Sequence, residues 1–355
     1  MIVDLHTHFF PAGLGDWAAA TGDERWPSLV VDDSGQARIM TGSSVFRPVA
    51  QTCWDPHRRL EAMDATGVDV QVLSPVPVML TTWADTALAV DFAKQQNDAF
   101  AAAAAKSPSR LLWLGTVPLQ DTDAAIAEMD RGLSLGMAGL EIGTEVSGRE
   151  LDDPTLRPFF LAADQWRVPL FIHPTDATGA IRRKGQPYEF GLGMLTDTAM
   201  AAGALVFGGV LDECPRLRVG LAHGCGSLPW TFPRMARAAT IGISPERYQR
   251  TMDHSAELFG RLWADTLVFE PSLLEVVLNR IGSNHLFLGS DFPFYPPEWG
   301  APTDVIDEVV RSGCCSAEEG AAVKGPNGLA FLGRAGDDSF EPQRDPGDVG
   351  SRHEL

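Results

Sequence analysis

Eight short apolar segments recur along the chain with helix-like stretches between them, and this alternation constrains the fold more than any other feature. Such alternation is typical of parallel strands joined by crossover helices. The segments are Ile2–Leu5, Val68–Leu73, Leu111–Val117, Ala138–Ile142, Pro169–Ile172, Arg218–Ala222, Leu262–Phe269 and Leu286–Gly289. Eight strand–helix units predict an α/β fold in which the strands close into a barrel.

The stretches between these segments are rich in Ala and Leu and mostly amphipathic, which indicates helices packed on the outside of the barrel. The clearest of them are Asp55–Thr66, Ala87–Ala105, Asp121–Leu135, Leu156–Arg167 and Met194–Cys214.

Two regions fall outside this repeat. Residues from about 13 to 53 are rich in Gly, Asp and Ser, with scattered Trp and Val, which predicts an insertion after the first strand that forms a small β lid. Residues 334–355 are acidic and contain Pro, Gly and Ser, which favours a flexible solvated tail over an arm that clasps a partner. We therefore expect one barrel domain over residues 1–333, followed by the tail.

The charge balance limits the kinds of partner. The 355 residues include 28 Lys and Arg against 47 Asp and Glu, a formal net charge of −19. Such a surface argues against binding to nucleic acid or to an acidic membrane. A small anionic substrate remains compatible, because a few arginines in a pocket can outweigh the overall field.

The five cysteines are scattered and form no CxxC pair, so the sequence supports neither a disulfide framework nor a cysteine zinc cluster. The first residues contain no basic and apolar leader, and no run approaches the roughly 20 apolar residues of a membrane span. We expect a soluble cytoplasmic protein with reduced thiols.

Histidines and one aspartate stand at the ends of the strand-like segments, where barrel active sites are built. His6 and His8 are two residues apart at the end of the first segment, so both side chains point the same way. His173, His223 and Asp291 are each the first strongly polar residue after a later apolar run. A hydrogen-bonded core histidine would explain any one of them, but five such groups at four strand ends predict a metal site.

Nitrogen and oxygen ligands without a thiolate suit Zn²⁺ best, with Mn²⁺ or Fe²⁺ as alternatives, and leave a coordination position for water. The sequence has no GxGxxG between a strand and a helix, no P-loop and no strand-end lysine for pyridoxal phosphate. We therefore expect one divalent metal as the cofactor.

The order HxH, His, His, Asp resembles the amidohydrolase superfamily. Five longer segments are similar to the 2-amino-3-carboxymuconate-6-semialdehyde decarboxylase family, over about Met1 to Gly333. They read CWDPHRRLEAMDATGVDVQVLSPVPVM, LGTVPLQD, FIHPTD, LAHGCGSLPWTFPR and LGSDFPF.

This resemblance implies a distorted (β/α)8 barrel with a single divalent metal, usually zinc, that removes CO₂ without oxidation. It implies that His6, His8, His173 and Asp291 are the metal ligands and that His223 is a catalytic base that acts on water. A lysine that bridges two metals in many superfamily members would follow the fourth strand, but this segment reads GLEIGT.

The resemblance also implies that two arginines hold the carboxylates of a small-molecule substrate. Arg47 in VFRPVA and Arg234 in TFPRMAR occupy the matching positions. In the family the second arginine reaches the site of the neighbouring subunit, so we expect a homodimer. Planar guanidinium groups can hold a carboxylate through two parallel hydrogen bonds, which lysine cannot do.

Three residues depart from the family pattern around the expected pocket. Thr175 and Glu141 stand where tryptophan and glutamine are usual, and Phe190 lies near the position of another tryptophan. A pocket relined in this way can take another acid, so the resemblance implies the reaction class, carboxy-lyase, and leaves the substrate open. The alternatives are a hydroxybenzoate-type decarboxylase that uses Mn²⁺, a metal-dependent hydrolase or hydratase, and a non-catalytic binding barrel.

Loss of CO₂ from an sp² carbon requires that this carbon first become tetrahedral. Either hydroxide adds to the alkene after His223 takes a proton from water, or an acid protonates the carboxyl-bearing carbon. Asp291 is able both to ligate a metal and to move a proton, and the sequence leaves both routes open.

Overall fold

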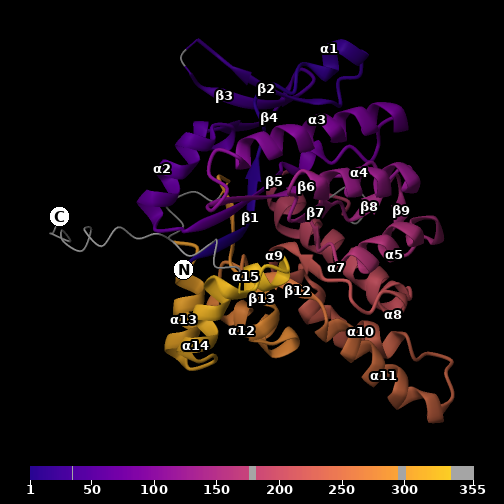
Figure 1. The fold of residues 1–355 in the computed structure, drawn as a ribbon. Helices are drawn as coiled ribbons and strands as arrows, with labels where there is room; N and C mark the ends of the chain where they lie inside the picture. Colours follow the sequence, from indigo (N-terminus) through magenta and orange to yellow (C-terminus); the bar gives the residue numbers. More distant parts are fainter. Residues whose placement is uncertain (34, 176–180, 295–300, 337–355) are drawn as a thin grey trace.

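The computed structural model describes residues 1–33, 35–175, 181–294 and 301–336. A nine-stranded sheet runs in the order β13-β12-β11-β10-β7-β6-β5-β1-β14, and all of its strand pairs are parallel. Only Leu288 separates β13, which pairs with β12, from β14, which pairs with β1. The two short strands therefore act as one eighth strand and close the barrel (Figure 1).

The barrel strands confirm the predicted (β/α)8 fold, since one strand lies within or across each of the eight predicted segments. They are β1 (Val3–Phe9), β5 (Val70–Pro75), β6 (Leu111–Gly115), β7 (Gly139–Ile142), β10 (Leu170–Ile172), β11 (Val219–Leu221), β12 (Trp263–Asp265), β13 (Leu286–Phe287) and β14 (Gly289–Phe292). The first strand is longer than predicted and includes both His6 and His8. The seventh is shorter and ends at Asp265.

The helices cover the outer face of the barrel (Figure 1). Those in the predicted stretches are α2 (Pro56–Thr66), α3 (Thr86–Ala104), α4 (Thr122–Ser134), α5 (Arg157–Trp166), α7 (Met194–Phe207) and α8 (Val210–Glu213). Later helices are α9 (Ala222–Cys225), α10 (Leu228–Ala238), α11 (Pro245–Gly260), α12 (Pro271–Ile281), α13 (Asp304–Ser312), α14 (Ala317–Lys324) and α15 (Pro326–Phe331). Asp55 and Asp121 begin α2 and α4 as N-caps, because each carboxylate accepts a free backbone N–H of the first turn.

The remaining short elements lie in the connections. They are the 3₁₀ turns η1 (Gln51–Cys53), η2 (Pro77–Met79), η3 (Pro154–Leu156) and η5 (Ser283–His285), the hairpin β8 (Glu145–Val146) and β9 (Arg149–Glu150), and the helical turns α6 (Gln186–Tyr188) and η4 (Glu189–Gly193).

The insertion after β1 is packed onto the barrel. It contains α1 (Trp17–Thr21) and an antiparallel sheet of β2 (Pro27–Val31), β3 (Ala37–Thr41) and β4 (Ser44–Val49). Trp26 and Ile39 are buried and join Phe10, Met79 and Phe92 in one apolar cluster. These contacts attach the sheet to α3 and to the segments that follow β1 and β5 (Figure 1). Most of the predicted tail, residues 337–355, lies outside the described residues, so the domain boundary at 333 stays a prediction.

One helical run, Gln186–Phe207, corrects the expectation that no segment approaches the length of a membrane span. Residues Gln186–Phe207 are long and apolar enough to cross a membrane by length and composition, with a mean hydropathy of 1.4 over 18 residues. In the fold, α7 packs against α9, α10 and α11, and half of its 14 residues are buried. Its apolar character therefore fits a helix that covers the barrel between β10 and β11.

The five cysteines are all free, and four of them are buried.

Candidate active site

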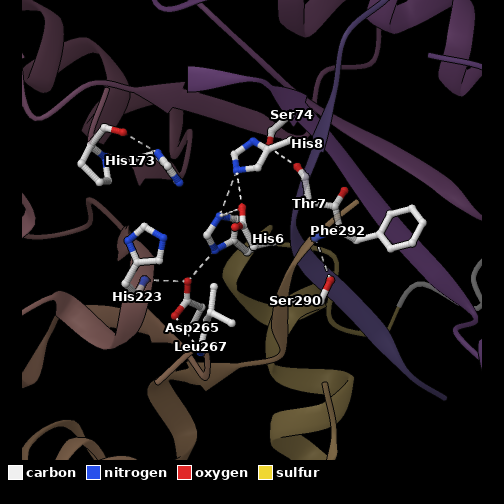
Figure 2. Close-up of polar contacts among 12 residues, drawn as sticks. His6, Thr7, His8, Ser74, His173, His223, Asp265, Leu267, Ser290 and Phe292 are labelled. Carbon is white, nitrogen blue, oxygen red and sulfur yellow. Dashed lines mark hydrogen bonds and ion pairs between the residues drawn. The ribbon is translucent and has the colours of Figure 1, made fainter. Parts of the chain in front are cut away.

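Four groups predicted as metal ligands converge at the carboxyl end of the barrel. His6, His8, His173 and Asp291 each offer one ligand atom, and these atoms all lie within 4.8 Å of one another. The Nε2 atoms of His6 and His8 are 3.2 Å apart, and Asp291 Oδ1 lies 3.0 Å from His8 Nε2 and 3.6 Å from His6 Nε2. We call these four residues the histidine cluster; Figure 2 shows its imidazole rings facing one another.

Each histidine of the cluster is oriented by a contact of its Nδ1 atom, the ring nitrogen that faces away from the centre. Nδ1 of His8 donates to the Pro75 carbonyl, and Nδ1 of His173 donates to the Pro174 carbonyl, both at 2.8 Å. Nδ1 of His6 lies 2.6 Å from Asp265 Oδ2. Because these acceptors fix the tautomer, every Nε2 is left unprotonated toward the centre of the cluster when the rings are neutral.

The donor set fits a divalent cation. The Nε2 atom of His173 is buried and has no hydrogen-bond partner among the described residues. Three neutral imidazoles and a carboxylate are the ligands that Zn²⁺ and Mn²⁺ take in proteins. The geometry thus brings the four predicted ligands together, while their role as ligands stays a prediction.

Electrostatics within the cluster couple the charges of its members. Burial lowers the pKa of His6, but Asp265 and Asp291 outweigh it and raise that pKa to about 9. The pKa of His173 is well below its ordinary value because of burial and the neighbouring imidazoles. Burial raises the pKa of Asp291, but hydrogen bonding to His8 and the charges of the histidines bring it below its ordinary value. The charged form of Asp291 and a positive charge on the neighbouring histidines therefore stabilise each other.

His223 lies beside the cluster as predicted. Its ring centroid is 5.1 Å from that of His173 and 5.5 Å from that of His6. Its Nδ1 atom is buried and has no partner among the described residues. Burial, and then the charge of His6, lower the pKa of His223 to about 4. The imidazole is consequently neutral near pH 7 and able to accept a proton.

Two of these residues have backbone conformations that L-residues rarely adopt. His223 has φ 57° and ψ 45°, and Asp291 has φ 59°. Left-handed non-glycine residues are strained and concentrate at functional sites. The left-handed backbone places the His223 side chain beside the cluster directly after β11. It likewise places the Asp291 side chain in the cluster from within β14.

Sequence reasoning missed Asp265, although it is central to the site (Figure 2). Its carboxylate binds His6 Nδ1 and accepts the backbone N–H groups of His223, Gly224 and Leu267 at 2.8 to 3.0 Å. It therefore fixes the tautomer of His6 and holds the strained turn that carries His223. The sequence pattern did not single it out, because the predicted segment Leu262–Phe269 runs past Asp265, whereas β12 ends at this residue.

Arg59 was also missed. It is 0% exposed and donates to the His8 carbonyl, to Thr7 Oγ1 at 3.1 Å and to the Thr52 carbonyl at 2.9 Å. Its guanidinium lies 4.9 Å from the ring centroid of Phe292. Burial lowers the pKa of Arg59 to about 10, so it stays charged and holds the end of β1 beside β14.

Glu141, noted above as a departure from the family, points into the barrel. It is 0% exposed, and neither carboxylate oxygen has a hydrogen-bond partner among the described residues. Burial raises the pKa of Glu141 to about 8 despite the lowering effects of Ser74 and His6. It lies outside the set of four ligand atoms.

Arg47 lies close to the cluster, whereas Arg234 is exposed. The Arg47 guanidinium is 4.5 Å from the ring centroid of Phe294, whose own ring is 5.5 Å from that of His8. Arg47 also lines a cavity of about 520 Å³ between the insertion and the barrel, together with Thr175 and Phe190. Arg234 is on the surface of α10, which projects from the barrel with α11 (Figure 1).

Known proteins share this architecture. The family model described as Amidohydrolase matches residues 3–334. The 2-amino-3-carboxymuconate-6-semialdehyde decarboxylase of Dictyostelium discoideum is 34% identical over 341 residues, which cover 93% of this chain and 91% of the relative. The gamma-resorcylate decarboxylase of a Rhizobium species is 29% identical and covers 70% of this chain and 81% of the relative.

A solved structure shows the same fold. The dihydroxybenzoic acid decarboxylase of a Polaromonas species, crystallised with manganese and the inhibitor 2-nitroresorcinol, superposes with a TM-score of 0.68 at 21% identity. The alignment covers 94% of this chain and 96% of that one. From the family model and the Dictyostelium relative together, the chain belongs to the amidohydrolase family and, within it, to the 2-amino-3-carboxymuconate-6-semialdehyde decarboxylase family.

Proposed function

We propose that this protein is a metal-dependent, non-oxidative decarboxylase of an unsaturated or aromatic carboxylic acid. The observation that carries the proposal is the convergence of four ligand atoms within 4.8 Å, with the neutral His223 beside them. The two curated relatives reported above, both named decarboxylases, support the reaction class.

The cofactor is one divalent cation, and we propose Zn²⁺, held by His6, His8, His173 and Asp291. A bound divalent cation polarises substrate oxygens and lowers the pKa of bound water to about 7. The manganese in the Polaromonas structure makes Mn²⁺ the alternative. Elemental analysis of the purified protein distinguishes the two metals.

The side chains of this protein then have separate tasks. His223 accepts a proton through its neutral imidazole and, once protonated, is able to return that proton to the substrate. Asp291 keeps one carboxylate oxygen toward the cluster and has a second oxygen for a proton in transit. Arg47 binds a substrate carboxylate through two parallel N–H groups and orients it toward the cluster. Phe294 shields this pair from water on one side, because the guanidinium lies over its ring.

For the substrate, we propose an acid related to 2-amino-3-carboxymuconate-6-semialdehyde, because that relative is the more similar over the longer part of the chain. A phenolic acid such as a dihydroxybenzoate is the second candidate, supported by the Rhizobium relative. The test is CO₂ release by the metal-loaded protein from a panel of muconic semialdehyde acids and phenolic acids. Release from neither group would refute the proposed activity.

A homodimer completes the proposal, with Arg234 bound to the substrate in the partner subunit. Trp230 and Arg234 are one helical turn apart on α10 and share its exposed face, where Trp230 is 82% exposed. Large exposed aromatic side chains mark interaction surfaces. Among the described residues, Arg234 has no ion-pair partner, which supports a partner on another chain.

We further propose a cytoplasmic location, in keeping with five free thiols.

Mixed dimers test this arrangement. Arg234→Ala and His6→Ala subunits, each inactive alone, are expected to regain activity when mixed, because one site in the mixed dimer has both residues intact. Sedimentation analysis must show subunit exchange in the same sample. Exchange without recovered activity would mean that each subunit has a complete site.

A further inference from the structure

The fourth barrel strand carries a carboxyl group that the chemistry above does not use. Glu141 on β7 is completely buried, and both of its carboxylate oxygens are without a hydrogen-bond partner in the described part of the chain. Burial of an unpaired carboxyl group is costly, so buried carboxyl groups in proteins are normally paired or bind a ligand. The buried, unpaired carboxyl group of Glu141 therefore indicates that a hydrogen-bonding ligand enters the site.

The strand register fixes the direction in which Glu141 points. Its Cα pairs in register with that of Phe171 on β10, and paired residues of parallel strands point to the same face. The ring of Phe171 packs inside the barrel, 5.0 Å from His6 and 6.1 Å from Phe287. Glu141 therefore faces the interior of the barrel on the side of the histidine cluster.

The protein itself supplies no partner there. The hydroxyl of Ser74 is near enough to lower the pKa of Glu141 as a hydrogen bond would, but its single proton is donated to the Thr7 carbonyl, and neither Glu141 oxygen has the geometry of a hydrogen bond to a described residue. His6 uses Nδ1 for Asp265, and no lysine or arginine forms an ion pair with Glu141 in the described ranges. Glu141 also lies outside the ligand set, so a substrate held at the histidine cluster is the partner that we infer for it.

We propose that Glu141 is a specificity-determining residue that binds a hydrogen-bond-donating substituent, a hydroxyl or amino group, on the acid held at the histidine cluster. The inference rests on the proposed function and names the substrate class more closely. Both candidate substrates fit, because one carries an amino group and the other carries hydroxyl groups. An acid without such a group would leave Glu141 buried against C–H groups, and sites of this kind reject such analogues by up to roughly 10⁴-fold.

The test uses unreactive probes on the metal-loaded protein. In 2-nitroresorcinol a nitro group stands in place of a carboxylate and has a hydroxyl on each side, whereas nitrobenzene has none. Competition calorimetry gives the preference of each protein for the first probe over the second. We expect this preference to fall at least about tenfold in Glu141→Leu, which has no acceptor, and by less in Glu141→Gln, whose amide oxygen still accepts a hydrogen bond.

Matched controls separate binding from folding. Glu128→Gln changes another buried carboxylate, which is bound to Asn97 and Arg131 away from the cluster, and should leave the preference unchanged. Metal content should be equal in all variants, and the midpoint of thermal unfolding of Glu141→Leu should equal or exceed that of the wild type.

Three results would overturn the inference. One is an unchanged preference in Glu141→Leu; if that variant does not fold, an unchanged preference in Glu141→Gln has the same meaning. Another is equal affinity of the wild type for the two probes. A third is a loss of preference of the same size in Glu128→Gln. Because the probes do not react, probe binding without CO₂ release from any acid would instead refute the proposed activity alone.

Discussion

Two buried polar regions of this protein differ in how well their polar atoms are paired. Around the histidine cluster, His173 Nε2, His223 Nδ1 and both oxygens of Glu141 have no partner among the described residues. Between α3, α4 and β6, the side chain of Asn97 bonds both backbone polar groups of Thr116 and also Glu128. Arg131 then bonds both oxygens of Glu128. We call this second region the α3–α4 network.

The difference separates a site from a scaffold. The α3–α4 network satisfies its own groups and can only hold helices to a strand. The histidine cluster leaves atoms unpaired, and two of its residues, counting the adjacent His223, keep left-handed backbones. The unpaired atoms around the histidine cluster lie within one small group of facing side chains, which is where a ligand can satisfy them together. Substitutions in the two regions should accordingly affect different measurements.

The largest effect is expected at a metal ligand. His173→Ala removes one of the four proposed ligands, so bound metal should fall to background and activity below detection, a loss of more than about 10⁴-fold. Metal analysis and CO₂ release measure the two losses. His254→Ala is the control, because that histidine pairs with Asp212 on the surface. Full metal content in His173→Ala would remove this histidine from the ligand set.

The next effect concerns the base. His223→Asn should keep the metal and lower kcat/KM by about 10²–10⁴-fold, the usual contribution of general acid–base catalysis. Asparagine tolerates the left-handed backbone at this position, so lost activity would not come from strain. Retention of most activity with full metal content would exclude His223 from the mechanism.

The α3–α4 network should respond in the opposite way. Asn97→Ala leaves the Thr116 N–H and carbonyl unpaired in the interior, so the free energy of unfolding should fall by about 2–3 kcal/mol. Denaturant titration measures this change, and kcat/KM of the folded protein should stay within twofold of the wild type. Lys94→Ala, an exposed position on the same helix, should change stability by less than about 0.5 kcal/mol. A large loss of kcat/KM in Asn97→Ala would show that the network also supports catalysis.

The fold and much of the candidate site could be predicted from the sequence, because both depend on strand periodicity. His6 and His8 are separated by two residues, and His173, His223 and Asp291 come where apolar runs end, so the barrel topology alone brings them together. The fold and the four predicted ligand positions follow from local pattern combined with one closed sheet.

The residues that sequence reasoning missed depend on contacts between distant segments. Asp265 was hidden inside a predicted strand that extended to Phe269, so its position at a strand end could not be recognised. Arg59 lies on a helix with many charged residues, and only the arrival of β1 and the Thr52 turn makes it buried. Glu141 was noted in the sequence as a departure from the family pattern, but only the structure shows that it is buried without a partner among the described residues.

The smallest effect should come from Glu141→Gln in the metal-free protein, and it depends on pH. The folded pKa of Glu141 is raised to about 8 from an ordinary 4.5, because burial disfavours the charged form. Below pH 4.5 the group is protonated in both folded and unfolded chains, so it costs little. As pH rises toward 8 the unfolded chain releases this proton and the folded one keeps it, so the wild type becomes progressively less stable.

Glutamine does not titrate, so the midpoint of thermal unfolding of Glu141→Gln should exceed that of the wild type by a few degrees at pH 8, and the gain should vanish toward pH 4.5. Glu128→Gln, which removes a paired carboxylate, should lower the midpoint at pH 8. Calorimetric scans at several pH values measure both. A stabilisation by Glu141→Gln that is independent of pH would mean that the Glu141 carboxyl finds a partner in the metal-free protein, and the contrast between the two regions would then not hold at this residue.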